Sequence, residues 1–154
     1  MFKCVLIANR GAIAVRIIRT LKTLGVRAIA VYAEADQHSL HVRQADEAFS
    51  LGVGNVRETY LSQDKLLAIA HRCGAEAIHP GYGFLSENAT FVERCTQEGV
   101  IFLGPTPAQM SAFGLKHSAR QLAETCRVPL LPGSGLLQNL EQALLCAETM
   151  GYPL

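Results

Sequence analysis

The chain has 154 residues, of which 49% are hydrophobic and 18% are charged, and its formal net charge at pH 7 is +1. This composition fits one globular domain and excludes a disordered tail, while the small net charge excludes the broad basic surface of a protein that binds nucleic acid or anionic membranes. No apolar run approaches the ~20 residues of a membrane helix, and Asn9 and Arg10 interrupt the apolar start too early for a signal peptide. We therefore expect a cytoplasmic protein without a nucleic-acid or membrane partner.

Short apolar runs alternate with longer amphipathic stretches along the chain, which is typical of βα units that build a parallel sheet. The pattern predicts strands at residues 3–8, 27–33, 47–51, 75–79 and 100–103. A helix that ends at Gly25 is expected between the first two strands. The residues expected to cap the later helices are Ser62, Ser86, Thr106 and Asn139. The sequence therefore predicts an α/β fold.

The cysteines and histidines show no metal-ligand spacing. Since the five cysteines contain no Cys-x-x-Cys pair, neither a zinc site nor a disulfide framework is expected, and we interpret them as small buried apolar residues. They are Cys4, Cys73, Cys95, Cys126 and Cys146. His38 and His41 are three residues apart and could share a helical face, but no third ligand is near them in the sequence. No metal site is predicted.

Residues 79–88 have the sequence His-Pro-Gly-Tyr-Gly-Phe-Leu-Ser-Glu-Asn and follow an expected buried strand. This position is the carboxyl edge of the sheet, where open α/β folds bind ligands. Pro80 and two glycines remove side-chain bulk and allow unusual backbone angles, which leaves Tyr82 and Glu87 as the polar groups that could contact a ligand. The alternative interpretation is a structural turn closed by Ser86 as a helix N-cap.

The strand-to-helix turn at residues 9–11 is a second candidate site, because free backbone N–H groups at a helix start suit an anion. A dinucleotide site is not favoured there, since the segment lacks Gly-x-Gly-x-x-Gly and neither Glu34 nor Asp36 clearly takes the ribose position. Arg10 is then interpreted as a residue that ties the loop together.

Residues 7–11 and 79–88 closely resemble two signatures of biotin carboxylases, in the same order and at about the same spacing. Residues 113–120 and 128–137 most resemble the urea carboxylase branch, whose enzyme is often fused to an allophanate hydrolase as urea amidolyase. Leu115 stands where most acyl-coenzyme A and pyruvate carboxylases are expected to have Asp. Ala12 departs from the family signature, which has Glu there, and a carboxylate at that position would stabilise the helix by about 0.3–1 kcal/mol.

The resemblance implies a Rossmann-like parallel sheet flanked by helices, the pre-ATP-grasp domain, over residues 1–127. A connector and the start of the ATP-grasp region would follow over residues 128–154. It also implies that Lys116 contacts ATP and that Tyr82 and Gly83 lie beside biotin. Glu87 is either a carboxylate close to that pocket or a residue that only favours the helix dipole. No catalytic residue is implied within residues 1–154.

The family reaction uses ATP, Mg²⁺ and bicarbonate to carboxylate protein-linked biotin. The resemblance implies two macromolecular partners, an ATP-grasp remainder of the same chain and a biotin carboxyl carrier domain. The chain is expected to be an inactive fragment without a tightly bound cofactor, since the family's glycine-rich lid is missing. Arg16 and Arg19 on one helix face indicate either a solvated surface or a homodimer contact.

Two alternatives remain open at this stage. One is the amino-terminal domain of another ATP-grasp ligase, such as one of purine synthesis, although the intact sequence of residues 79–88 argues against it. The other is a non-catalytic nucleotide-sensing or scaffold module.

Overall fold

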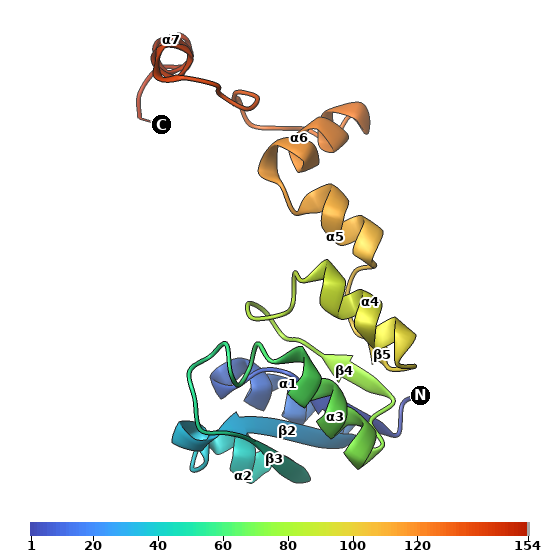
Figure 1. The fold of residues 1–154 in the computed structure, drawn as a ribbon. Coiled ribbons are helices and arrows are strands. Elements are labelled where there is room, and N and C mark those ends of the chain that lie inside the picture. Colours follow the sequence, from blue (N-terminus) through green and yellow to red (C-terminus); the bar gives the residue numbers. More distant parts are fainter. Residues whose placement is uncertain (154) are drawn as a thin grey trace. The chain divides into compact units, whose positions relative to one another are not determined.

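The computed structural model describes residues 1–153. The chain divides into two units, Met1–Met110 and Ser111–Leu154, which are described separately. The first unit holds a five-stranded sheet in the order β3-β2-β1-β4-β5, and every strand pair is parallel (Figure 1). The strands are β1 (Cys4–Ile7), β2 (Arg27–Ala33), β3 (Glu47–Gly52), β4 (Ala77–His79) and β5 (Ile101–Phe102). The predicted α/β fold is confirmed, with the first, fourth and fifth strands shorter than expected.

Helices cover both faces of this sheet. The helical elements of the first unit are α1 (Gly11–Thr23), η1 (Glu34–Asp36), α2 (Leu40–Gln44), α3 (Gln63–Cys73) and α4 (Ala89–Gln97), and α5 (Pro107–Phe113) follows β5. Val5 and Ile7 of β1 pack with the apolar face of α1, whereas Leu6 packs with α3 and α4 in a second, larger core. β1 is therefore buried on both faces, as the central strand of a parallel sheet should be.

The helix ends correct one prediction and confirm another. Gly25 follows α1 with a φ of +69°, as predicted for a glycine that ends a helix. The prediction that Ser86 caps the next helix is wrong: α4 begins at Ala89, and the side chain of Asn88 accepts a hydrogen bond from the Phe91 N–H at 2.8 Å. Ser86 instead lies in the turn before the helix, so Glu87 is not in the first helical turn.

The second unit contains α6 (Lys116–Thr125) and α7 (Leu140–Met150). Asn139 caps α7 as predicted, because its side chain accepts a hydrogen bond from the Gln142 N–H at 2.9 Å. Among residues 111–153, only Ala147 is buried. The boundary between residues 127 and 128 stays a prediction. Within the described residues, no helix is long and apolar enough to cross a membrane.

Candidate functional site

Two loops meet at the carboxyl edge of the sheet, one after β1 and the other after β4. These strands are neighbours, and the chain order of the strands reverses between them, which is the point where open α/β sheets bind ligands. Asn9, only 4% exposed, follows β1. Its Nδ2 donates hydrogen bonds to the carbonyl oxygens of Pro80 at 2.7 Å and Tyr82 at 2.8 Å. One buried amide thus joins the loops that carry the two sequence signatures.

Gly81 and Gly83 differ in the space that a side chain would find at each position. Gly81 has a φ of +67°, and a Cβ there would lie 2.8 Å from Asn9 Nδ2, so any side chain would disturb the junction. Gly83 has a φ of +66°, yet a Cβ there would meet no atom within 4 Å. Backbone conformation alone therefore favours glycine at residue 83, and the space beside it is open.

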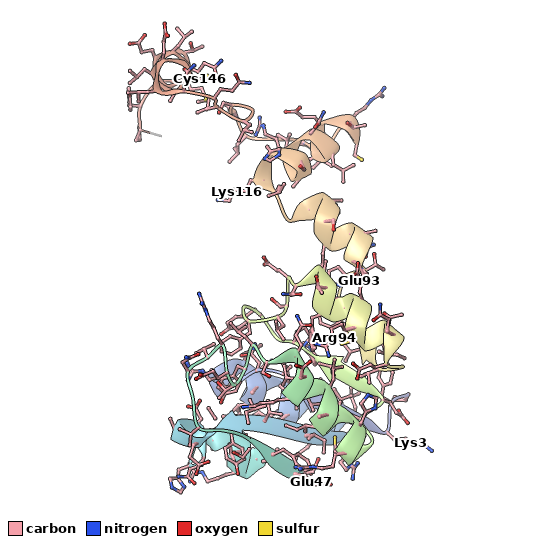
Figure 2. The ribbon with its side chains drawn as sticks, viewed as in Figure 1. Lys3, Glu47, Glu93, Arg94, Lys116 and Cys146 are labelled. Carbon is pink, nitrogen blue, oxygen red and sulfur yellow. The ribbon has the colours of Figure 1, made fainter. Side chains whose placement is uncertain are left out.

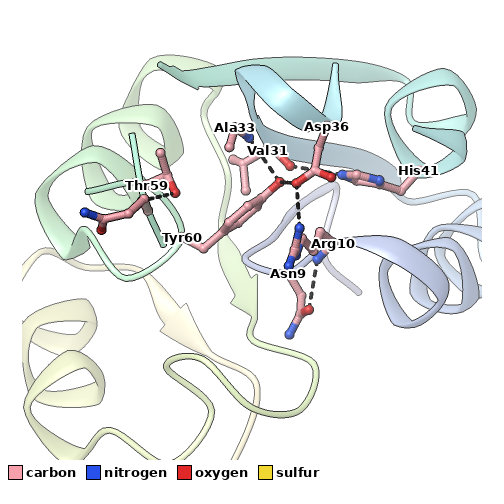
Figure 3. Close-up of polar contacts among 9 residues, drawn as sticks. Asn9, Arg10, Val31, Ala33, Asp36, His41, Thr59 and Tyr60 are labelled. Carbon is pink, nitrogen blue, oxygen red and sulfur yellow. Dashed lines mark hydrogen bonds and ion pairs between the residues drawn. The ribbon is translucent and has the colours of Figure 1, made fainter. Parts of the chain in front are cut away.

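Arg10, Asp36 and Tyr60 form a polar cluster next to this junction (Figure 3). The Arg10 guanidinium lies 3.0 Å from Asp36 Oδ2, and the Tyr60 hydroxyl donates to the same oxygen at 2.7 Å. The Tyr60 hydroxyl also accepts a hydrogen bond from the Ala33 N–H at 3.0 Å. Both bonds of the phenol are therefore satisfied, and the Asp36 carboxylate is already engaged by two donors. The weak case for a dinucleotide site at residues 9–11 stays a prediction.

Aromatic packing connects this cluster to residues 79–88. The rings of Tyr60 and Phe84 stack with centroids 5.2 Å apart, and the Arg10 guanidinium lies 5.5 Å from the Tyr60 centroid and 6.0 Å from that of Phe84. Phe84 has a positive φ of 46°, which is unfavourable for a residue with a side chain. Phe84 packs against Tyr60 in this conformation, and the Arg10 guanidinium lies near both rings.

The protonation states follow from burial and hydrogen bonding. Burial alone would raise the pKa of Asp36, but the hydrogen bonds from Tyr60 and Arg10 outweigh it and hold this pKa below its usual value. Burial also raises the pKa of Tyr60, so its phenol stays protonated. Burial lowers the pKa of His79, whose Nδ1 accepts a hydrogen bond from the Gly81 N–H at 3.0 Å. In these protonation states, the hydrogen bonds of Asp36, Tyr60 and His79 fix the shape of the loop of residues 79–88 and its surroundings.

The residues implied by the resemblance are all on the surface. Tyr82 is 68% exposed, and Gly83 and Glu87 are exposed on the same loop. Lys116 is the exposed first residue of α6 in the second unit (Figure 2). Their roles toward biotin and ATP stay predictions.

Sequence reasoning missed the contacts that shape this loop. Tyr60 lies far in sequence from both Arg10 and Phe84, so no local pattern could pair them. A signal did exist for Asn9, because it is the first polar residue after the apolar run of residues 4–8.

The histidines and cysteines lie in different surroundings. Within residues 1–153, no group of three His, Cys, Asp or Glu side chains is placed to hold a metal ion. His41 is buried whereas His38 is exposed, so the pair does not share an environment. All five cysteines are free; three are buried as interpreted, but Cys126 is exposed and Cys146 is half-buried.

The sheet order, the helices on both faces and the loop junction define a Rossmann-like α/β domain with a candidate ligand-binding edge between its first and fourth strands. Residues 1–110 match the family described as "Biotin carboxylase, N-terminal domain", and the chain belongs to this family.

Three similar proteins illustrate the relationship. The chain is 51% identical to the biotin carboxylase of Halalkalibacterium halodurans, over 99% of this chain and 34% of the relative. It is also 51% identical to the urea amidolyase of Lachancea kluyveri, over 99% of this chain and 8% of the relative. The crystal structure of the biotin carboxylase domain dimer of Hydrogenobacter thermophilus 2-oxoglutarate carboxylase, in complex with MgADP, ADP and bicarbonate, has a TM-score of 0.88 and 44% identity, covering 99% of this chain and 34% of that one. The chain therefore spans about a third or less of the length of these proteins.

Proposed function

We propose that the chain is the amino-terminal part of the biotin carboxylase component of a biotin-dependent carboxylase, an ATP-dependent ligase of the cytoplasm. The complete enzyme would use ATP, Mg²⁺ and bicarbonate to carboxylate biotin on a carrier domain. The observation that carries the proposal is the junction at Asn9, whose amide fixes the loop of residues 79–88 at the carboxyl edge of the sheet. Residues 7–11 and 79–88, which resemble the two family signatures, thus meet at the same edge of the sheet.

The loop has the properties that a flat ligand ring requires. The open space beside Gly83 lets a ring approach the backbone, and the exposed Tyr82 offers an aromatic face with a hydroxyl group. The ureido ring of biotin fits this surface, and its nitrogen would accept the carboxyl group in the complete enzyme. The residues of this chain bind and orient the ring; none of them is proposed as the acid or base.

Lys116 is proposed to contact the ATP phosphates. A lysine ammonium is a mobile point charge with three donors, which suits a polyphosphate. The described residues supply no cluster of metal ligands, so no part in holding Mg²⁺ is assigned to them.

Urea is proposed as the final acceptor because residues 113–120 and 128–137 resemble the urea carboxylase branch. The 51% identity to a urea amidolyase over 99% of the chain supports this choice. The identity to a biotin carboxylase is also 51%. A homodimer through the helix face of Arg16 and Arg19 is also proposed, and the related Hydrogenobacter domain, which is described as a dimer, supports the oligomeric state.

The decisive experiment replaces Lys116 in the complete enzyme. Lys116→Met removes the charge but keeps most of the side-chain length, so we expect the KM for ATP to rise at least about tenfold, the effect of losing one charge-assisted hydrogen bond. Steady-state kinetics with varied ATP measures this. The control is Lys3→Met, an exposed lysine directly before β1 at the amino edge of the sheet, which should leave KM unchanged. An unchanged KM and kcat in Lys116→Met would remove this residue from the nucleotide site.

A further inference from the structure

Phe84 occupies a backbone position where glycine or asparagine is the usual residue. The Ser86 N–H donates a hydrogen bond to the Gly83 carbonyl oxygen at 2.9 Å, which closes a turn with Phe84 at its second position. The φ of Phe84 is +46°, directly after the φ of +66° at Gly83. Turns with a positive φ at the second position are dominated by glycine, asparagine and aspartate, because a larger side chain crowds the backbone there. An aromatic residue at this position therefore needs a contact that compensates the crowding.

The ring of Tyr60 supplies that contact. It lies almost parallel to the ring of Phe84, with an interplanar angle of 2° and centroids 5.2 Å apart. Tyr60 is only 1% exposed, and its hydroxyl is held at both Ala33 and Asp36, so the ring has little freedom to move. Phe84 is half-buried and also packs against the larger apolar core. The gain from one such aromatic pair is of the same order as the cost of a positive φ, so the pair can decide the backbone conformation.

The space beside Gly83 is open, so packing at this glycine cannot fix its own conformation. A Cβ at Gly83 would meet no atom within 4 Å. The Asn9 amide holds the loop before this point, and the cap at Asn88 holds it afterwards. Between these two anchors, the Phe84 ring is the side chain by which residues 83 and 84 reach the core, because Gly83 has none.

We propose that Phe84 is a positioning residue of this loop. Its ring, stacked on Tyr60, holds residues 83 and 84 in the left-handed conformation in which Gly83 borders the open space. The inference rests on the proposed function, in which the biotin ring approaches Gly83. Phe84 does not contact the ligand; it raises the fraction of the enzyme whose loop is ready to bind. A loop that is ready only part of the time binds its ligand more weakly by that fraction, whereas turnover at saturating ligand is unchanged.

Two replacements of Phe84 in the complete enzyme separate backbone conformation from packing. Phe84→Leu removes the stack and disfavours the positive φ, so we expect the KM for free biotin to rise about tenfold while kcat stays unchanged. Phe84→Asn also removes the stack, but asparagine tolerates this φ, so the KM should change by less than about threefold. A role in packing alone predicts the reverse order, because leucine keeps more of the apolar contact with the core. The matched control is Phe102→Leu, at a half-buried phenylalanine of β5 whose ring contacts Phe91, and it should leave the KM unchanged.

Hydrogen–deuterium exchange of the same variants tests the loop conformation without biotin. The hydrogen bond from the Ser86 N–H to the Gly83 carbonyl oxygen should protect this amide in the wild type. We expect a peptide that contains Ser86 to exchange faster in Phe84→Leu than in Phe84→Asn. Faster exchange with an unchanged KM would retain Phe84 as the residue that orders the loop and would contradict the proposed biotin contact instead. Equal KM and equal exchange in both variants, or a larger effect of Phe84→Asn, would overturn the positioning role.

Discussion

At the scale of single residues, Asp36 makes the stability of the first unit depend on pH. Its folded-state pKa is lowered, so its stabilising effect is fully present above the unfolded value of about 3.9 and is lost as the pH falls toward the folded value. Asp36→Asn should therefore lower the free energy of unfolding by about 1–3 kcal/mol at neutral pH, and by progressively less as the pH falls from about 4 through the lowered folded-state pKa. Urea denaturation at neutral pH and at a series of pH values below about 4 measures the difference. The control is Asp64→Asn, whose carboxylate is 85% exposed in its pair with Arg94 and should matter little. An equal loss at every pH would contradict the role of the charge.

Gly83 allows backbone strain to be separated from ligand contact. Its φ of +66° disfavours valine, whereas asparagine tolerates this conformation. In the complete enzyme, Gly83→Val should reduce carboxylation of free biotin more than bicarbonate-dependent ATP cleavage, because the side chain fills the space proposed for the ring. Gly83→Asn should show the same bias with less loss of thermal stability. If both activities fall equally while the melting temperature drops by several degrees, the residue is structural and does not contact biotin.

At the scale of elements, the start of α4 distinguishes two adjacent capping candidates. Asn88→Ala removes the acceptor of the Phe91 N–H and should destabilise the first unit by about 1 kcal/mol. Ser86→Ala should change the stability by less than about 0.5 kcal/mol, since Ser86 lies in the turn before the helix. Thermal and urea unfolding of the two variants measures both effects. A larger loss for Ser86→Ala would restore the original prediction of the helix start.

The start of α4 also shows which parts of the structure can be predicted from the sequence. Apolar periodicity predicted the strands and helices because it reflects burial on the sheet faces, and Gly25 and Asn139 marked helix ends through local chemistry. Ser86 and Asn88 are both good caps, so the choice between them depends on which side chain reaches a free N–H in three dimensions. The position of the loop at the sheet edge was predictable, whereas the Tyr60 and Phe84 stack depends on two loops brought together by the whole sheet.

At the scale of the whole molecule, almost all of the buried side chains belong to the first unit. The two apolar cores consist of residues of the first unit, whereas Ala147 is the only buried residue among residues 111–153. A segment that buries so little apolar surface gains little stability by itself. We infer that the first unit determines the cooperative unfolding of the chain.

This imbalance predicts weak nucleotide binding by the 154-residue chain. Lys116 is exposed on α6, in the unit with almost no buried residues, and tight binding of a nucleotide requires a pocket that encloses most of its surface. A single exposed ammonium contributes little against the entropic cost of holding a flexible triphosphate. Calorimetry with MgATP should therefore give a dissociation constant above about 1 mM, with Lys116→Met indistinguishable from the wild type. A micromolar constant that Lys116→Met abolishes would show that residues 1–154 already form a complete nucleotide site.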